Sequence, residues 1–350
     1  PSLVGSEMCI RDRFSIMLRP VMDFGGTRIK EIKNQLIDLK RFGKLLEKNY
    51  EVYGIVRRES IENVEKLKNL KNIKDKIHLV TCSLDNALSV YKLFNEVKPD
   101  ECYHLAANSF VSYSMEEDLA VMNNNFTSTY NLLMSILDIC PQCKLYFAGS
   151  SEIFGNAEQY PQDENCRYNP RSIYGISKLA SHLLVKNYRE RFGLFACTGF
   201  AYNHESPRRG LAFVTRKITS SVAEIALGKN KIIELGDIEA QRDWGYAPEY
   251  VEAMYLMLNT KEPKDYVLAT GVLHSVKDIL KVAFDYIGED YEKHIKIKDE
   301  FIRQRENIPL VGNAEKISID LGWKANKKFE DIIKEMVQED IKRIEGRKLQ

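Results

Sequence analysis

Closely spaced glycines are missing from this sequence of 350 residues. It has 19 glycines, and no two of them are two or three positions apart. The patterns G-x-G-x-x-G and G-x-x-G-x-x-G, which bring a strand–turn–helix backbone close to a pyrophosphate, are therefore absent. Taken alone, this absence argues against a dinucleotide-binding protein.

Long apolar runs and an excess of charge are missing too. No apolar run reaches the roughly 18 residues of a membrane span, and the opening segment PSLVGSEMCIRDRF has no signal-peptide-like apolar stretch. The formal net charge is +1, which gives no bulk attraction to nucleic acid or to a membrane surface. We therefore expect a cytoplasmic protein with neither of these partners.

The seven cysteines show no disulfide or metal-ligand pattern. An odd number in a chain of this size suits free thiols in a reducing compartment. Cys140 and Cys143 form a C-x-x-C, but a zinc site needs a second pair of ligands and a redox site a thioredoxin-like context. We interpret the pair as ordinary cysteines at a helix-to-strand turn and expect no metal.

From residue 51 onward, short β-branched runs alternate with helical patterns. Strands are predicted at 51–56, 77–81, 101–105, 144–148 and 195–200. Helices are predicted at 61–72, from an N-cap at Asp85 to 97, at 118–139 and at 173–192. This alternation is typical of an α/β fold, a doubly wound parallel sheet of the Rossmann type with helices on both faces.

After residue 203 the rhythm changes. Helices predicted at 213–227, 248–259, 276–287 and 329–343 are separated by short strands. We interpret this part as a smaller α+β cap that binds substrate over the carboxyl ends of the sheet. The predicted domains are 44–202 with about 243–270 for the sheet, and about 203–242 with 271–345 for the cap.

Residues 1–43 fit neither domain. The first 30 residues show no buried apolar strand, and 29–49 have the pattern of a basic amphipathic helix. A doubly wound sheet ordinarily opens with a buried strand, a glycine turn and a helix. We therefore expect an atypical N-terminal segment.

Tyr174 and Lys178 lie one helical turn apart in the segment SIYGISK. An ammonium group beside a phenol favours the phenolate and lowers the pKa of the phenol, and it can also hold a ribose. Tyr-x-x-x-Lys by itself is also common on a solvated helix face, so the pair needs support from its surroundings.

Support comes from the segment GSSE at 149–152, which follows the strand predicted at 144–148. Open α/β sheets bind ligands at the carboxyl ends of their strands. The two hydroxyls and the carboxylate would provide a hydrogen-bond donor and a base beside the Tyr/Lys pair. A turn serine and a carboxylate at a helix start are the plain alternatives for Ser150 and Glu152.

Small residues and cations follow other strands. The segment LAANS at 105–109 lets either a ligand or a packing helix approach the backbone. The arginines at 57–58 suit the 2′-phosphate of NADP, or equally a basic loop. The stretch NHESPRRG at 203–210, with Lys217 and Arg242, places cations at loop ends, which suits a nucleoside diphosphate better than scattered surface ion pairs.

Together these segments resemble the extended short-chain dehydrogenases/reductases, and within them the GDP-mannose 4,6-dehydratase family, over about residues 50–343. The most specific are YEVYGIVRRES, GSSEIFG, NPRSIYGISK, NHESPRRGLAFVTRKI and QRDWGYAPEYVEAMYLML. The resemblance implies conversion of GDP-mannose to GDP-4-keto-6-deoxymannose and water, by internal oxidation, elimination and reduction with bound NADP, in deoxysugar biosynthesis.

The resemblance also implies roles for single residues. Tyr174 would accept the hydroxyl proton at C4 of mannose, Ser150 would hydrogen-bond the C4 oxygen, and Glu152 would remove the C5 proton. Lys178 would hold the nicotinamide ribose and tune Tyr174. The implied NADP contacts are Arg57, Arg58, Ser60, Leu84, Leu105, Ala106, Ala107, Ser109, Lys178, His204 and Arg209. The implied GDP-mannose contacts are Ser151, Asn203, Lys217, Arg242, Arg303 and Glu306.

The chain departs from the family at its start. Family members open with a strand and G-x-x-G-Q-D-G, whose amides at a helix N-terminus hold the pyrophosphate, and residues 1–43 carry nothing like it. A frameshift or foreign sequence before about residue 42 would explain this. Three interpretations stay open: an active dehydratase, a non-catalytic sugar-nucleotide-binding relative, or another sugar-nucleotide dehydratase or epimerase. A homo-oligomer, dimer or tetramer, is implied in each enzyme case.

Overall fold

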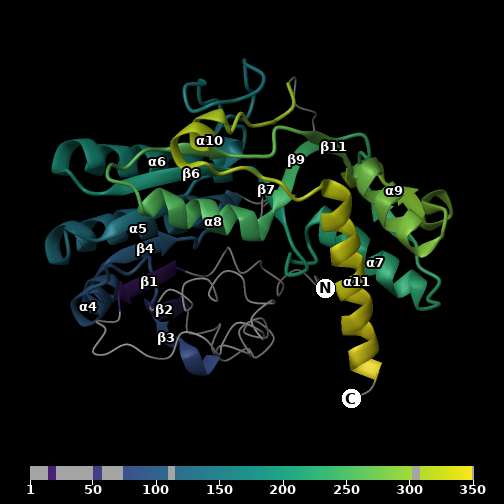
Figure 1. Ribbon diagram of the computed structural model, residues 1–350, viewed down its shortest axis with the longest axis horizontal. Coiled ribbons are helices and arrows are strands. Elements are labelled where there is room, and N and C mark those ends of the chain that lie inside the picture. Colours follow the sequence, from purple (N-terminus) through teal and green to yellow (C-terminus); the bar gives the residue numbers. More distant parts are fainter. Residues whose placement is uncertain (1–14, 21–49, 57–73, 109–114, 302–307, 349–350) are drawn as a thin grey trace.

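The chain folds into two lobes that lie side by side (Figure 1). The computed structural model describes residues 15–20, 50–56, 74–108, 115–301 and 308–348. The larger lobe holds a seven-stranded sheet in the order β10-β6-β5-β4-β1-β2-β3. Its strands are β1 (Ser15–Pro20), β2 (Tyr50–Val56), β3 (His78–Thr81), β4 (Glu101–His104), β5 (Lys144–Ala148), β6 (Ala196–Ala201) and β10 (Tyr266–Leu268).

The sheet is parallel apart from one strand. Each of the five predicted strands is confirmed to within one residue at either end, and their neighbours in the sheet, β10 included, pair in parallel except where β1 intervenes. β1 is antiparallel to both β2 and β4. The doubly wound fold expected from the sequence is present, with a mixed sheet in place of a wholly parallel one.

β1 shows that the expectation of no strand within the first 30 residues is wrong. The segment Ser15–Pro20 fills the slot between β2 and β4, and Met17 is fully buried there. An open slot would leave backbone N–H and C=O groups of two flanking strands unpaired, so even a short apolar segment gains from filling it. Because Ser15 pairs with Ile55 and His104, the chain enters β1 at the carboxyl ends of its neighbours and leaves it at their amino ends.

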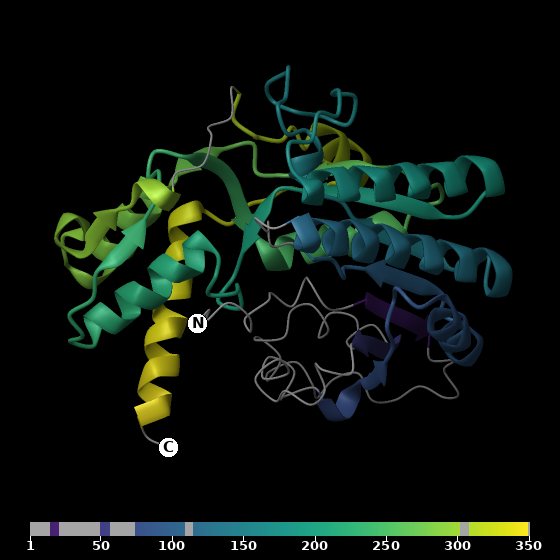
Figure 2. The ribbon, with the colours of Figure 1, turned by 180° about the vertical axis from the view of Figure 1, so that it is seen from behind.

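Helices cover both faces of the sheet (Figures 1 and 2). On one face pack α4 (Ala87–Val97), α5 (Met115–Ile139) and α6 (Ile173–Phe192), and on the other pack α8 (Ala247–Leu258) and α10 (Glu315–Leu321). Successive side chains of a strand point to opposite faces. Accordingly Leu145 of β5 joins the α4–α6 core, whereas Tyr146 joins the core beneath α8.

Most predicted helices match the structure to within one residue at either end, but α5 begins before the predicted residue 118 and α11 continues beyond the predicted residue 343. One predicted helix cap is also wrong. Asn86, not Asp85, caps α4, because its side chain accepts a hydrogen bond from the Ser89 amide at 2.9 Å. Asp85 instead accepts from the Ser83 hydroxyl at 2.5 Å. Asp and Asn cap helices about equally well, so adjacent candidates are separated only by backbone geometry. The helices predicted at 29–49 and 61–72 lie outside the described residues.

The smaller lobe combines short strands with three helices. The helices are α7 (Val214–Ala226), α9 (Val276–Ile287) and α11 (Phe329–Lys348), and the strands are β7 (Asn203–Glu205), β8 (Ile233–Leu235), β9 (Gln241–Tyr246), β11 (Leu273–Ser275) and β12 (Ile295–Ile297). Apolar side chains of all three helices form its core, among them Val222, Ile279 and Ile333. The exact domain boundaries stay a prediction. No helix within the described ranges is long and apolar enough to cross a membrane.

Asp243 of β9 fastens several segments of this region together. Its buried carboxylate accepts hydrogen bonds from the amides of Thr270 and Gly271 at 2.9 Å each, from the Thr270 hydroxyl at 2.7 Å, and from the Gly312 amide at 3.3 Å. Burial raises the pKa of Asp243 although these donors oppose the shift. The aspartate of the RDWG segment is thus a structural residue.

The cysteines in the described part of the chain are all free and buried. Cys140 and Cys143 lie at the turn from α5 to β5, where the Cys143 amide donates to the Cys140 carbonyl at 2.8 Å. No group of three or more His, Cys, Asp or Glu side chains that could hold a metal occurs among the described residues.

A mostly buried ion pair joins α6 to the residue before β10. Arg189 donates to both carboxylate oxygens of Asp265, at 2.8 and 2.7 Å, and the Thr198 amide donates to Asp265 at 2.7 Å. Burial by itself would raise the pKa of Asp265, but the Arg189 guanidinium and these hydrogen bonds hold it below its usual value. The carboxylate form is therefore part of the folded structure.

Asp265→Asn should lower the free energy of unfolding at pH 7 by on the order of 3 kcal/mol, because it leaves Arg189 without its charge partner. A carboxyl group with a depressed pKa stabilises the fold above its unfolded pKa of about 3.9 and loses this contribution as the pH falls through its folded pKa. The difference between variant and parent should therefore shrink below about pH 4 in urea titrations. Glu190→Gln, which breaks the exposed Lys186–Glu190 pair, is the control and should cost less than about 0.5 kcal/mol. Equal losses in both variants would contradict this role of Asp265.

Candidate active site

Helix α6 places Tyr174 and Lys178 beneath the carboxyl end of β5. The helix begins after Ser172, whose hydroxyl accepts the Gly175 amide at 3.1 Å. Lys178 is only 1% exposed, and its ammonium donates to the Ala148 carbonyl at 2.9 Å. Its Nζ lies 5.9 Å from the centre of the Tyr174 ring, which is also buried. The solvated-face alternative for this pair is therefore wrong.

The residues that follow β5 turn toward this pair. Ser150 accepts a hydrogen bond from the Glu152 amide at 3.3 Å and so starts the short helix η4 (Ser151–Ile153). Ser150 and Ser151 are buried, whereas Glu152 is half-buried. The turn-serine interpretation of Ser150 thus describes its backbone contact. Ser150 follows β5, whose last carbonyl accepts the hydrogen bond from Lys178. This position brings the Ser150 hydroxyl to the candidate site.

Gly175 lets these two segments approach each other closely. A Cβ atom on Gly175 would lie 2.7 Å from the Glu152 carbonyl oxygen and 3.0 Å from Pro170 Cβ. The absence of a side chain therefore allows the first turn of α6 to rest against η4. Gly175 was not among the predicted site residues, although a glycine beside Tyr174 within a helix was a usable signal.

The end of β4 borders the same place. Ala107 packs against Tyr174 and Val121. Asn125 of α5 accepts from the Asn108 amide at 2.7 Å and donates to the Ser177 hydroxyl at 2.9 Å, so it ties the end of β4 to α6. Asn125 was not among the residues predicted for the site. A fully buried asparagine in a helix that faces a sheet has to find such partners.

The remaining cofactor candidates near the sheet have different surroundings. Leu84 and Leu105 are buried in the two cores that flank the sheet, and Ala106 packs against the core formed with α4–α6. The Leu84 carbonyl also accepts a hydrogen bond from Asn131 of α5 at 2.9 Å.

His204 and Arg209 lie where the larger lobe passes into the smaller one. His204 Nδ1 is 2.8 Å from the Tyr202 carbonyl, and the ring stacks on Tyr250 with centroids 4.8 Å apart. The Arg209 guanidinium lies 3.7 Å over the Phe213 ring. Its Nε is 3.5 Å from the buried carboxylate of Glu205.

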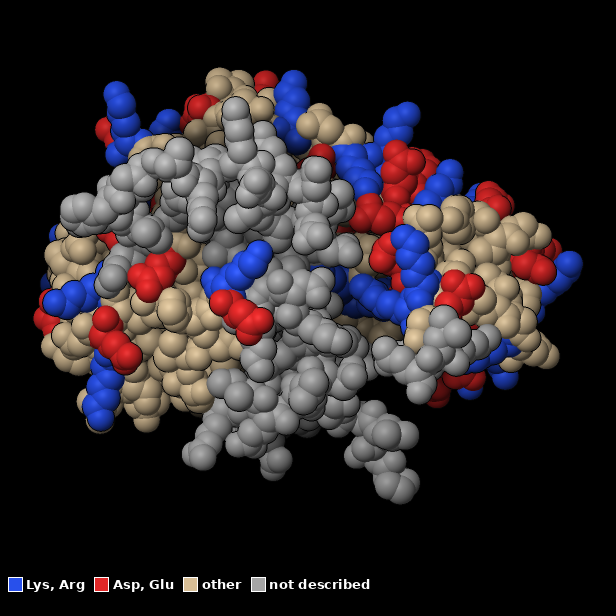
Figure 3. All heavy atoms as spheres, turned by 60° about the horizontal axis from the view of Figure 1, so that its bottom comes forward, with Lys and Arg blue, Asp and Glu red and all other residues tan. Residues whose placement is uncertain are grey.

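The substrate candidates of the smaller lobe come from three elements. Asn203 begins β7, paired with Trp244 of β9. Arg242 of β9 donates to the Gln241 carbonyl at 2.7 Å, and Lys217 of α7 donates to the Glu234 carbonyl at 2.5 Å. Burial lowers the pKa of Lys217. On the face drawn in Figure 3, Lys and Arg side chains lie beside Asp and Glu side chains where the two lobes meet.

Six candidates cannot be placed in the site. Those that lie outside the described residues are Arg57, Arg58, Ser60, Ser109, Arg303 and Glu306. They stay predictions.

The direction of β1 bears on how a pyrophosphate could be held. In a dinucleotide-binding sheet, the strand in this slot runs parallel and ends at a helix N-terminus that faces the pyrophosphate. Here β1 leaves the sheet at the opposite edge, at Pro20. None of the helices described in residues 74–108, 115–301 and 308–348 follows β1 directly. Among the described residues, β1 therefore does not end at the edge of the sheet where a pyrophosphate would lie.

Sequence comparison identifies relatives along most of the chain. A family model described as GDP-mannose 4,6 dehydratase matches residues 42–336. The chain is 42% identical over 306 residues to GDP-mannose 4,6 dehydratase 1 of Arabidopsis thaliana, with 85% of this chain and 84% of that protein covered. It is 38% identical over 321 residues to GDP-mannose 4,6 dehydratase of Homo sapiens, with 85% and 86% covered.

Solved structures share the fold at lower sequence identity. RMD from Pseudomonas aeruginosa complexed with NADPH superposes with a TM-score of 0.70 at 21% identity, covering 79% of this chain and 95% of that one. UDP-glucose 4-epimerase of Thermotoga maritima with UDP-glucose gives 0.76 at 22% identity, covering 87% and 96%. These two show the architecture alone. The family match over residues 42–336 and the relatives near 40% identity establish that the chain belongs to the GDP-mannose 4,6-dehydratase family.

Proposed function

We propose that this protein converts GDP-mannose to GDP-4-keto-6-deoxymannose and water. The observation that carries the proposal is the convergence of Ser150, Glu152, Tyr174 and Lys178 around the carboxyl end of β5, from two segments that Gly175 allows to touch. Membership in the family supplies the substrate and the reaction.

Each of the four side chains has a task that suits its chemistry. The positive charge of Lys178 favours the ionised form of Tyr174, which takes the proton from the C4 hydroxyl of mannose. The Ser150 hydroxyl donates to the C4 oxygen. Glu152, half-buried and so reachable from solvent, removes the C5 proton and delivers a proton to the C6 hydroxyl as it leaves as water. An epimerase would need no such base at C5, so Glu152 favours dehydration over the epimerase alternative.

We propose NADP as the cofactor, which supplies the hydride acceptor and donor that protein side chains lack. Lys178 and Tyr174 would face its nicotinamide ribose, with Leu84, Leu105, Ala106 and Ala107 along the strand ends and His204 and Arg209 nearby. Arg57, Arg58, Ser60 and Ser109 complete the proposed set. The donors at α6 fit a nicotinamide nucleoside, whereas β1 provides no counterpart of the usual pyrophosphate anchor.

A second candidate function follows from β1. A sugar-nucleotide-binding relative without catalysis would keep the substrate contacts of the smaller lobe, proposed as Ser151, Asn203, Lys217, Arg242, Arg303 and Glu306, while holding NADP too weakly to react. The reversed strand is the observation that favours it.

Self-association is a further part of the proposal. Large apolar side chains are exposed on one stripe of α5, with Leu119 63%, Tyr130 42% and Met134 42% exposed, and on the neighbouring α6, with Ile176 40% and Leu183 50% exposed. Adjacent helices with apolar faces are typical of an interface between subunits. A homo-oligomer, dimer or tetramer, in the cytoplasm is the proposed state.

The purified full chain, incubated with GDP-mannose and NADP+, should yield the 4-keto-6-deoxy sugar nucleotide, identified by its mass and proton spectrum. Because the sequence lacks the glycine pattern and β1 does not end at the carboxyl edge of the sheet, we expect turnover to depend on added NADP+, with little cofactor retained through purification. The retained cofactor is measured after denaturation. Binding of GDP-mannose without product at saturating NADP+ would overturn the catalytic proposal and support the binding-only function.

Glu152→Gln keeps the shape of the side chain but removes the base. We expect kcat to fall by about 10²–10⁴. In D2O, incorporation of solvent deuterium at C5 should also be lost. GDP-mannose binding, measured by calorimetry, should stay unchanged. Glu158→Gln, at an exposed residue paired only loosely with Arg167 at 3.5 Å, is the matched control. Full activity in Glu152→Gln would remove Glu152 from the base role.

Gly175→Ala tests the contact between α6 and η4. Alanine is the better helix former by about 1 kcal/mol, but its Cβ would force Glu152 and Tyr174 apart. We expect kcat to drop about 10²-fold, because displacements near 1 Å have effects of this size. Gly346→Ala in α11, whose Cβ would meet nothing within 4 Å, should leave kcat unchanged. Equal kcat in the two variants would show that the close approach is not needed.

A further inference from the structure

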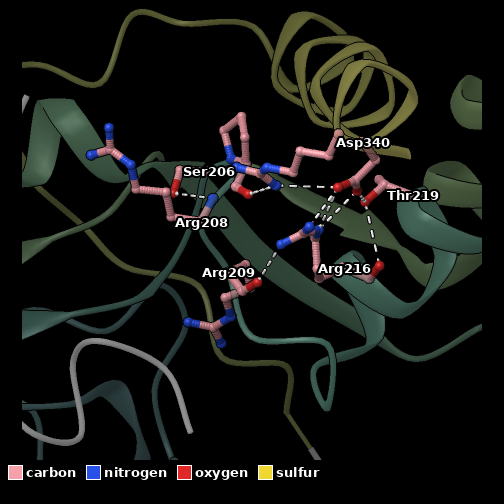
Figure 4. A network of polar contacts seen from close by, with 8 residues as sticks. Ser206, Arg208, Arg209, Arg216, Thr219 and Asp340 are labelled. Atoms are coloured by element: carbon pink, nitrogen blue, oxygen red, sulfur yellow. Dashed lines mark hydrogen bonds and ion pairs between the residues drawn. The ribbon is translucent and has the colours of Figure 1, made fainter. Parts of the chain in front are cut away.

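Asp340 of helix α11 is buried in a cluster of positive charge. Its carboxylate is 2% exposed. It accepts from Arg216 of α7 at Nε, 2.8 and 3.0 Å, and at Nη2, 2.5 Å. It also accepts from the Thr219 hydroxyl at 3.1 Å and from Arg343 at 3.2 Å (Figure 4). Both oxygens are thus engaged by donors on α7 and α11.

Both arginines also donate hydrogen bonds to one loop. Arg216 Nη1 donates to the Arg209 carbonyl at 2.8 Å, and Arg343 Nη1 donates to the Pro207 carbonyl. The loop at 206–210 is itself turned by a bond from the Arg209 amide to the Ser206 carbonyl at 2.9 Å. Backbone carbonyls of the loop are therefore fixed to a helix more than a hundred residues later in the chain.

The loop carries Arg209, which is one of the proposed NADP contacts. Figure 4 shows Arg208 and Arg209 extending from it, away from Asp340. Arg209 in turn lies over Phe213 and beside Glu205. A shift of the loop backbone would move the Arg209 guanidinium with it.

The Asp340 carboxylate compensates the positive charges of Arg216 and Arg343. Burial and the neighbouring Arg216 charge lower the pKa of the Arg343 guanidinium. Without a carboxylate between them, these two cations would repel each other across a partly buried space. Removing one partner of a buried charge cluster leaves the others uncompensated, which is strongly unfavourable.

We propose that Asp340 is a positioning residue of the active site, which acts through Arg216 and Arg343 to hold the 206–210 loop and so the cationic side chain that meets an anionic dinucleotide. The inference rests on the proposed function for its ligand. The anchor itself rests on the contacts of described residues alone. The proposal gives a part in ligand affinity to α11, a helix of the smaller lobe that supplies none of the proposed site residues.

The first arm of the test is independent of catalysis. Full-length protein and Asp340→Asn are digested briefly with trypsin, and the cleavage rates after Arg208 and Arg209 are followed by mass spectrometry. We expect cleavage there about tenfold faster in the variant, since release of the loop exposes its backbone. Arg343→Met, at a residue 36% exposed, tests the same anchor with less risk to folding. Glu339→Gln, on the same helix and paired with Lys342 near the surface, is the control and should behave as the parent.

The second arm compares the apparent KM for NADP+ with kcat in the same proteins. The anchor predicts a KM about tenfold higher and a kcat changed less than about twofold in Asp340→Asn, a split that general destabilisation would not produce. If no protein turns over GDP-mannose, the proposed function has failed and the proteolysis still decides the anchor. Unchanged cleavage in both Asp340→Asn and Arg343→Met overturns the inference, as does an open loop with unchanged KM.

Discussion

The buried ammonium of Lys178 donates a hydrogen bond to the Ala148 carbonyl at the end of β5, and much of the larger lobe is arranged around that contact. A charge that is 1% exposed needs a fixed partner, and Ala148 supplies it at 2.9 Å. The bond sets the height of α6 against the sheet and thereby the position of Tyr174. Asn125 then ties α6 to the end of β4, so two strand ends and two helices meet at one place.

The same edge of the sheet is where parallel strands end and where short turns can present backbone and small polar groups. η4 occupies it because Ser150 caps its own turn and because Gly175 leaves room. On the other side of the edge, the smaller lobe contributes through β7 and β9, whose pairing places Asn203 beside Trp244. Asp243 and Asp340, two buried carboxylates with several donors each, hold the segments that surround this junction.

The N-terminal part of the sheet is built differently from the family pattern that the rest of the chain follows. Its central slot is filled by a short antiparallel strand, so the sheet is continuous in hydrogen bonding but not in direction. A sheet tolerates this because ladder bonds can form with either polarity. A phosphate-binding turn does not tolerate it, since that turn needs a strand that ends at the carboxyl edge. Within the described residues, the sheet is therefore continuous although β1 does not end at its carboxyl edge.

The sequence by itself determined the strand–helix alternation, the ends of the five predicted strands and most ends of the predicted helices that the structure describes, the pairing of Tyr174 with Lys178, and the family. Local signals suffice for these, because periodicity and caps act over a few residues. Only the tertiary structure decided that Ser15–Pro20 forms a strand and in which direction, that Asn86 caps α4, and that Gly175, Asn125 and Asp340 support the site. Each of these depends on groups far away in the chain: an unpaired slot between two strands, a carbonyl across a helix contact, or two arginines near one carboxylate. Such partners leave no periodic trace in the sequence, so the physical reason for each appears only when the chain is folded.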